Sequence, residues 1–144
     1  MEINKRSECP ISFGLDIFGD KWSLLIIRDI MFWEKNTYGA FINSGEKIAT
    51  NILADRLVKL ENAGIIEKQE HPESRAKHFY KLTKKGIDLM PILMEIIVWS
   101  DKYTEVPREA KLFSKLVKKN RQDLIKKISL GLLAHLQKPS KLSK

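Results

Sequence analysis

The stretch from Lys47 to Leu82 constrains the fold more than any other part of the chain, because one helical pattern is followed immediately by a hairpin pattern. At about 100° per residue, the apolar positions of the helix fall on one side, namely Leu53, Leu57 and Leu60. Gly64 then gives a helix stop signal, and Ile65 begins a strand pattern. We therefore predict an amphipathic helix with a polar outer face, joined directly to a two-stranded wing.

Two strand patterns follow this helix, and a shorter helical pattern precedes it. The strands are expected at Glu67–His71 and His78–Leu82, joined around Pro72–Arg75. The short helix is expected at Tyr38–Asn43, and an Asn-Ser-Gly turn signal at 43–45 separates it from the longer one. A short helix, a tight turn and a second helix form a helix-turn-helix. The predicted fold class is mainly α (α+β), a winged helix-turn-helix domain with one or more additional C-terminal helices.

Further helices are predicted on both sides of this unit. Pro10 opens the first, and Asp20 is a candidate N-cap for a core helix over Lys21–Phe32. Thr83 is a candidate cap for a last domain helix whose apolar positions run to Trp99. That helix is apolar around nearly its whole circumference, which is typical of a helix buried on more than one side. In a domain of this size, a second copy of the chain is the natural second surface.

Composition is typical of a soluble globular protein. The chain has 144 residues, of which 43% are hydrophobic and 31% charged, which is enough for one domain with a real core. The polar N-terminus has no apolar signal-peptide core, and no apolar run is long enough to cross a bilayer. The single cysteine excludes an intramolecular disulfide and fits a reducing compartment, so we expect a cytoplasmic protein.

The sequence carries no recognisable enzyme motif. It lacks G-x-S-x-G, a P-loop, a dinucleotide-binding glycine motif and Cys-x-x-Cys. The three histidines, His71, His78 and His135, show no metal-ligand spacing with one another or with Cys9. We therefore expect no enzyme activity, no cofactor and no metal.

Positive charge is concentrated in two segments of the chain. Residues 47–85 carry 9 Lys/Arg against 5 Asp/Glu, and residues 107–144 carry 11 against 2. The remaining segments are mildly acidic, so these two segments account for the net charge of +8 and the isoelectric point near 9.6. Such a distribution suggests a polyanionic partner.

The C-terminal segment is amphipathic, with apolar residues at helical spacing and lysines between them. We expect residues 1–105 to form a winged-helix DNA-binding and dimerisation domain, residues 106–137 a basic amphipathic helical extension, and residues 138–144 a disordered tail. The extension has three candidate roles. It could enlarge a dimer interface, which we favour, add phosphate affinity, or lie on an anionic membrane, which we favour least.

The order and spacing of these features match one known family. From about Cys9 to Ser100, the chain resembles the HxlR family of winged-helix transcription regulators, a branch of the MarR-like group. The landmarks are Cys9-Pro10, Gly19-Asp-Lys21-Trp22, Leu25-x-Ile27-x-x-x-Ile30, Tyr38-x-x-Phe41, Ile48, Leu53-x-x-Arg56-Leu57-x-x-Leu60-Glu61-x-x-Gly64, Tyr80-x-Leu82-Thr83-x-x-Gly86-x-x-Leu89-x-Pro91 and Trp99. Each landmark is weak alone, and together they are specific. One departure is His78, because the family usually has an apolar residue there.

The resemblance implies a homodimer that binds a pseudo-palindromic operator in double-stranded DNA, and we expect a repressor or autoregulator. The longer helix would enter the major groove, and the wing would touch the adjacent minor-groove backbone. By position, the implied DNA-binding residues are Lys47, Thr50, Asn51, Ala54, Asp55, Lys59, Arg75, Lys77 and His78. The Asn51 amide suits adenine, whereas lysines suit phosphates. Arg56 is expected to form an ion pair, with Glu61 as the candidate partner.

Cys9 carries a separate hypothesis. The resemblance implies a candidate redox-sensing role, because some family members sense oxidants through a cysteine at this Cys-Pro position. A thiol at a helix N-terminus can be unusually reactive. Against that role, Glu2 and Glu8 would oppose ionisation of the thiol, and cysteine is also a common small core residue.

Two other interpretations stay open from the sequence. The helix and hairpin could be ordinary surface elements packed on one another. A winged helix can also serve as a protein–protein interaction module without specific DNA binding, and Asp55 and Val58 on the outer face favour that use. Steep salt dependence of binding to duplex DNA would distinguish a DNA-binding protein from such a module.

Overall fold

The computed structural model describes residues 5–136, and within them the side chains of all residues except 74–76, 135 and 136. The elements are α1 (Pro10–Phe18), α2 (Ser23–Trp33), α3 (Tyr38–Ile42), α4 (Thr50–Asn62), β1 (Ile66–His71), β2 (Ser74–Leu82), α5 (Lys84–Ile87), α6 (Met90–Tyr103), α7 (Arg108–Lys119) and α8 (Arg121–Leu136). They form two compact units, one ending at Gly86 and one beginning at Ile87. The expected tail at 138–144 lies outside the described residues.

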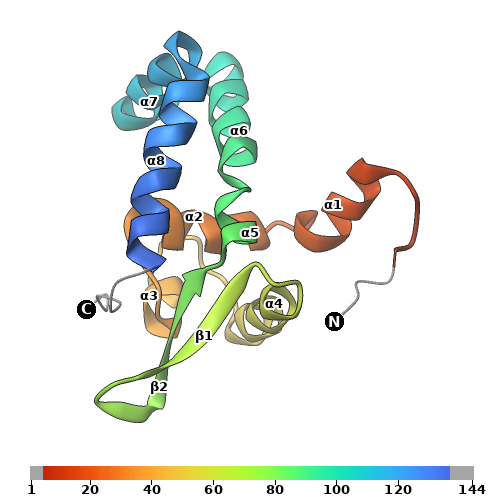
Figure 1. Cartoon of the computed structure of the whole chain (residues 1–144), viewed down its shortest axis with the longest axis vertical. Helices are drawn as coiled ribbons and strands as arrows, with labels where there is room; N and C mark the ends of the chain where they lie inside the picture. Colours follow the sequence, from red (N-terminus) through yellow and green to blue (C-terminus); the bar gives the residue numbers. More distant parts are fainter. Residues whose placement is uncertain (1–4, 137–144) are drawn as a thin grey trace. The chain divides into compact units, whose positions relative to one another are not determined.

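The first unit is a winged helix-turn-helix, which confirms the predicted fold class. Helix α3, a turn and α4 are followed by the antiparallel β1–β2 hairpin, and α4 contacts β1 (Figure 1). The register runs from Ile66 opposite Leu82 to His71 opposite Ser74, with an irregularity at Glu70/His71. Strand β2 is therefore longer than expected, because cross-strand hydrogen bonds continue past the end of the apolar alternation.

Residues that link α2 to α3 also pair with the wing, which the sequence did not indicate. Thr37 forms an isolated antiparallel bridge with Phe79, and the Tyr80 N–H donates to the Asn36 carbonyl at 2.8 Å. The Tyr80 ring packs on Phe41, with centroids 6.0 Å apart. Phe79 and Tyr80 are consequently both buried, although neighbouring strand residues point to opposite faces.

Two helix boundaries differ from the expectation for physical reasons. Helix α2 begins at Ser23 rather than Lys21, although Asp20 still caps the preceding turn by accepting the N–H groups of Trp22 and Ser23. The helix expected after Thr83 is split into α5 and α6. Pro91 lies in the first turn of α6, where its missing N–H is tolerated, whereas inside a continuous helix it would break the ladder.

The second unit contains α6, α7 and α8. Helix α7 packs on α6, and the side chains of Ser114 and Val117 on α7 are fully buried. Asp101 on α6 faces Lys111 and Lys118 of α7 at 4.0 and 3.9 Å. The amphipathic extension is thus helical, in two helices. None of the helices within residues 5–136 is both long and apolar enough to cross a membrane.

Candidate nucleic-acid interface

Helix α4 presents two contrasting faces. Leu53, Leu57 and Leu60 are 0%, 3% and 0% exposed, which fixes the rotation of the helix about its axis. On the other side, the side chains of five sequence-predicted site residues are exposed: Thr50, Asn51, Ala54, Asp55 and Lys59. The helix therefore offers a solvent-facing surface of mainly small and polar groups, interrupted by the exposed Val58.

The turn before α4 fixes where that surface begins. Gly45 and Lys47 both have positive φ angles, of 95° and 59°, so the backbone bends sharply before Ala49. The Tyr38 hydroxyl donates to the Thr50 carbonyl at 2.9 Å, which ties α3 to the first turn of α4. Tyr38 was a sequence landmark, but its hydrogen bond depends on the turn geometry and leaves no pattern in the sequence.

An ion-pair network anchors α4 to the start of α2. Arg56 Nε lies 2.9 Å from Asp20 Oδ2, and the Arg56 guanidinium also pairs with Asp55. The expected ion pair of Arg56 is therefore present, but Glu61 is the wrong partner. The error arises because Asp20 is 36 residues away in sequence and reaches Arg56 only in the folded chain.

The network also sets the ionisation of these groups. Burial raises the pKa of Asp20, but hydrogen bonds from Ser23, Trp22 and Arg56 outweigh it and leave that pKa below its ordinary value. The hydrogen bond with Asp20 is the main cause of a raised pKa for Arg56. Lys59 Nζ lies 3.2 Å from Asp55 Oδ2, so the Asp55 carboxylate already has two cationic partners.

The predicted site residues of the wing differ from one another in exposure. The Lys77 side chain is exposed, as a backbone-contacting residue requires. His78 is only half-buried as a residue, but its Nδ1 atom is buried and has no hydrogen-bond partner among the described residues. Arg75 lies in strand β2 rather than in the connection between the strands, which is Pro72-Glu73. The side chain of Arg75 lies outside the part of the chain that the structure describes.

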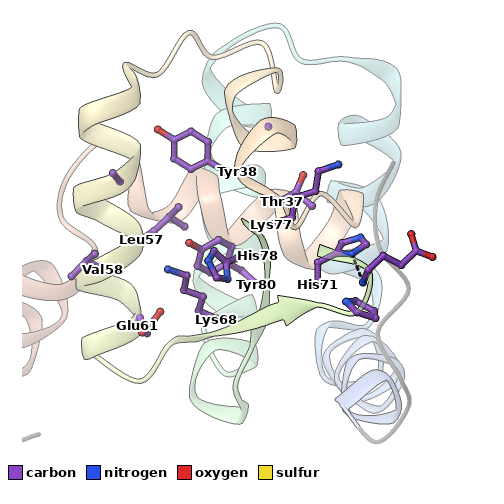
Figure 2. Close-up of a pocket in the computed structure, with 14 residues that line it drawn as sticks. Thr37, Tyr38, Leu57, Val58, Glu61, Lys68, His71, Lys77, His78 and Tyr80 are labelled. Atoms are coloured by element: carbon purple, nitrogen blue, oxygen red, sulfur yellow. Dashed lines mark hydrogen bonds between the residues drawn. The ribbon is translucent and has the colours of Figure 1, made fainter. Parts of the chain in front are cut away.

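A hollow of about 970 Å³ lies between α4, the start of α3 and the wing (Figure 2). Leu57 and Val58 line it from α4, Tyr38 from α3, and His78 and Tyr80 from β2. These residues come from three separate stretches of the chain, so the sequence contained no signal for this hollow.

Cys9 lies at the N-cap of α1 and is exposed. Its backbone N–H donates to Ser7 Oγ at 3.1 Å. The thiol is thus at the surface rather than in the core, so it is accessible to reagents. Its candidate role in redox sensing stays a prediction.

Comparisons with known proteins agree with this geometry. The family model of HxlR-like helix-turn-helix domains matches residues 17–108. The helix-turn-helix transcriptional regulator sll1512 of Synechocystis sp. is 33% identical over 86 residues, which cover 60% of this chain and 63% of that protein. The transcriptional regulator YodB of Bacillus subtilis is 33% identical over 98 residues, which cover 67% of this chain and 87% of YodB.

Solved structures give the same assignment. PA1607, a candidate transcription factor, aligns with a TM-score of 0.64 and 38% identity over 72% of this chain and 71% of that one. Reduced YodB aligns with a TM-score of 0.55 and 28% identity over 69% of this chain and 97% of YodB. The chain therefore belongs to the HxlR-like helix-turn-helix family of transcriptional regulators.

Proposed function

We propose that this regulator is a cytoplasmic homodimer that represses transcription, its own included, by binding a pseudo-palindromic operator. One observation carries the proposal. The small polar side chains of α4 face solvent, while the leucines on its other side are buried and the Asp20–Arg56 pair holds the helix. A helix held in this way can enter a major groove while its leucine stripe stays buried.

Dimerisation is supported by apolar surface on two helices. None of the residues of α1 is buried, and its Ile11 and Leu15 are 72% and 54% exposed. On α6, Trp99 and Tyr103 are 65% and 63% exposed. Exposed apolar patches of this kind mark protein–protein interfaces. Two copies of the chain would bury these faces and place two α4 helices on the two halves of a palindrome.

The proposal can be tested by fluorescence anisotropy on a duplex from upstream of the protein's own gene, with a shuffled duplex as control. Both are titrated at low and near-physiological salt, and sedimentation equilibrium is measured at the same protein concentrations. Binding by a dimer that keeps its preference for the native duplex at higher salt would support a specific operator reader. Equal, salt-sensitive binding of both duplexes, or binding by a monomer, would contradict it.

The Asn51→Ala variant should bind the native duplex about 5- to 30-fold more weakly, because a lost bidentate base contact costs roughly 1–2 kcal/mol. Its affinity for the shuffled duplex should stay unchanged. Asn62→Ala is the matched control, since Asn62 is also exposed on α4 but lies about three turns further along. If both variants lose affinity equally for both duplexes, Asn51 does not read bases.

The candidate redox role of Cys9 has support from a relative. YodB has been solved in a reduced form, in a diamide-treated form and in a quinone-bound form. In this chain the single cysteine is exposed, so an oxidised thiol could form a disulfide only with another molecule. Diamide should therefore weaken DNA binding by the unchanged protein and leave Cys9→Ser unaffected. An equal response of both proteins would eliminate this role.

A further inference from the structure

The outer face of α7 carries two leucines that stay half exposed in the described chain. Helix α7 packs on α6 and α8, and Ser114 and Val117 on its inner side are fully buried. Leu112 and Leu116 lie one helical turn apart on the outer side, where they are 50% and 54% exposed. The family model ends at Arg108, the first residue of α7, so family membership assigns no role to this face.

Three basic side chains share this outer face with the leucines. At about 100° per residue, Arg108, Lys115 and Lys119 lie within about 60° of Leu112 around the helix. All three are exposed, and none forms an ion pair with another residue in the described part of the chain. Glu109, at the edge of the face, is the one acidic residue in the α7 sequence. The outer face of α7 thus combines apolar surface with a net positive charge.

The chemistry of this face limits what can cover it. A second copy of the same face would bring like charges together, which is unfavourable at an interface. Duplex DNA would pair with the cations, but the two leucines would then face phosphates. An anionic membrane takes up a broad apolar helix face, whereas α7 offers only the two leucines on this side. A protein helix that carries both apolar and acidic side chains complements both features of the face.

We propose that the outer face of α7 docks an amphipathic helix of a partner protein, in which Asp or Glu residues flank an apolar stripe. The apolar stripe packs on Leu112 and Leu116, and the carboxylates pair with Arg108, Lys115 and Lys119. A single helix on this face buries less than about 1,200 Å², so we expect a dissociation constant of about 10–100 µM. The contact involves no DNA, so it stands or falls independently of the proposed function.

The probe for this proposal is a fluorescein-labelled peptide of about 15 residues, made of Glu, Ala and Leu with all leucines on one helical face. A second peptide of the same composition, with its leucines spread around the helix, is the control. Both are titrated with the full chain and followed by fluorescence anisotropy. The patterned peptide should bind saturably and at least about fivefold more tightly than the control peptide, because only its leucines can meet the α7 leucines together.

Two variants with matched controls locate the binding face. The double variant Leu112→Ala/Leu116→Ala should weaken peptide binding about tenfold, and α7 should stay folded because alanine favours a helix. Leu130→Ala should leave the affinity unchanged, although Leu130 on α8 is similarly exposed at 58%. Lys115→Glu should weaken binding several-fold, whereas the same charge change in the wing, Lys77→Glu, should not.

Equal binding of the two peptides, or an unchanged affinity of the double leucine variant, would overturn the proposal. Three further results would do so by assigning the face to another occupant. Loss of self-association in the double leucine variant, measured by sedimentation equilibrium, would indicate a second copy of the chain. Binding to phosphatidylglycerol vesicles that the double variant loses would indicate a membrane. A greater loss of affinity for a shuffled duplex in Lys115→Glu than in Lys77→Glu would indicate DNA. A chain that binds the patterned peptide but no operator would contradict only the proposed function.

Discussion

Replacing Gly86 with alanine is expected to lower the free energy of unfolding by about 3 kcal/mol. A Cβ at this position would lie 2.3 Å from the backbone oxygen of Ile65 and 3.1 Å from the Leu82 side chain. The clash is with backbone, so no side-chain rotation can relieve it. Moving the strand would also disturb the hydrogen bond from the Thr83 N–H to the same Ile65 oxygen, at 3.0 Å. Urea unfolding followed by circular dichroism measures the loss.

Gly39→Ala is the matched control for this prediction. Gly39 lies in α3, and nothing approaches within 4 Å of a Cβ built there. The same substitution should therefore raise stability by about 0.5–1 kcal/mol, because alanine favours the helix over glycine. If Gly86→Ala behaved like Gly39→Ala, the close approach of Gly86 to the Ile65 backbone would be wrong.

Asp20→Ala should lower the free energy of unfolding by about 2.5–4 kcal/mol. The substitution removes the hydrogen bonds that Asp20 accepts in the turn before α2, which are worth about 1 kcal/mol, and the charged hydrogen bond from Arg56, which is worth roughly 1.5–3 kcal/mol. Because Arg56 belongs to α4, the loss should also loosen the proposed DNA-binding helix. Faster amide hydrogen exchange in α4 would show this, and unchanged exchange would mean that the pair does not hold the helix.

The lowered pKa of Asp20 predicts a pH dependence with a definite sign. A carboxyl group whose pKa is lower in the folded state adds stability above its unfolded pKa of about 3.9, and loses that contribution as the pH falls through the folded value. The stability difference between the unchanged protein and Asp20→Asn should therefore be largest near neutral pH and shrink in acid. A constant difference would show that charge plays no part.

Asp29 provides the comparison of opposite sign. Its side chain is buried on α2 beside Arg28, and burial raises its pKa despite that partner. The folded state therefore binds the Asp29 proton more tightly than the unfolded state does. Relative to Asp29→Asn, the unchanged protein should gain stability as the pH falls from neutral towards about 4.

Local pattern was sufficient to predict most of the fold. The leucine stripe of α4, the Gly64 stop and the strand patterns each depend on neighbouring residues, and the structure confirms them. One boundary was wrong because a residue on the partner strand determines it, and another because the apolar pattern concealed the effect of a proline. Cross-strand pairing extends β2 to Ser74, and Pro91 divides the last predicted helix although apolar residues continue through it.

The candidate site was predictable in its exposure but not in its contacts. The α4 residues that the family resemblance implies do face solvent. The partner of Arg56, however, depends on how α2 and α4 pack, and no spacing rule connects residue 20 with residue 56. The hollow beside α4 is likewise lined by three separate segments of the chain, which no local pattern brings together.

The ion pairs on α4 have a thermodynamic consequence for any polyanion that approaches it. Arg56 and Lys59 are already neutralised by Asp20 and Asp55. Either cation would have to exchange a protein carboxylate for a phosphate, so this part of the helix adds little new positive charge at the contact. Counterion release should then come mainly from exposed cations such as Lys77, which has no ion pair with any described residue. The total of 26 Lys and Arg side chains therefore overstates the number of phosphates that the protein can neutralise without giving up an internal ion pair.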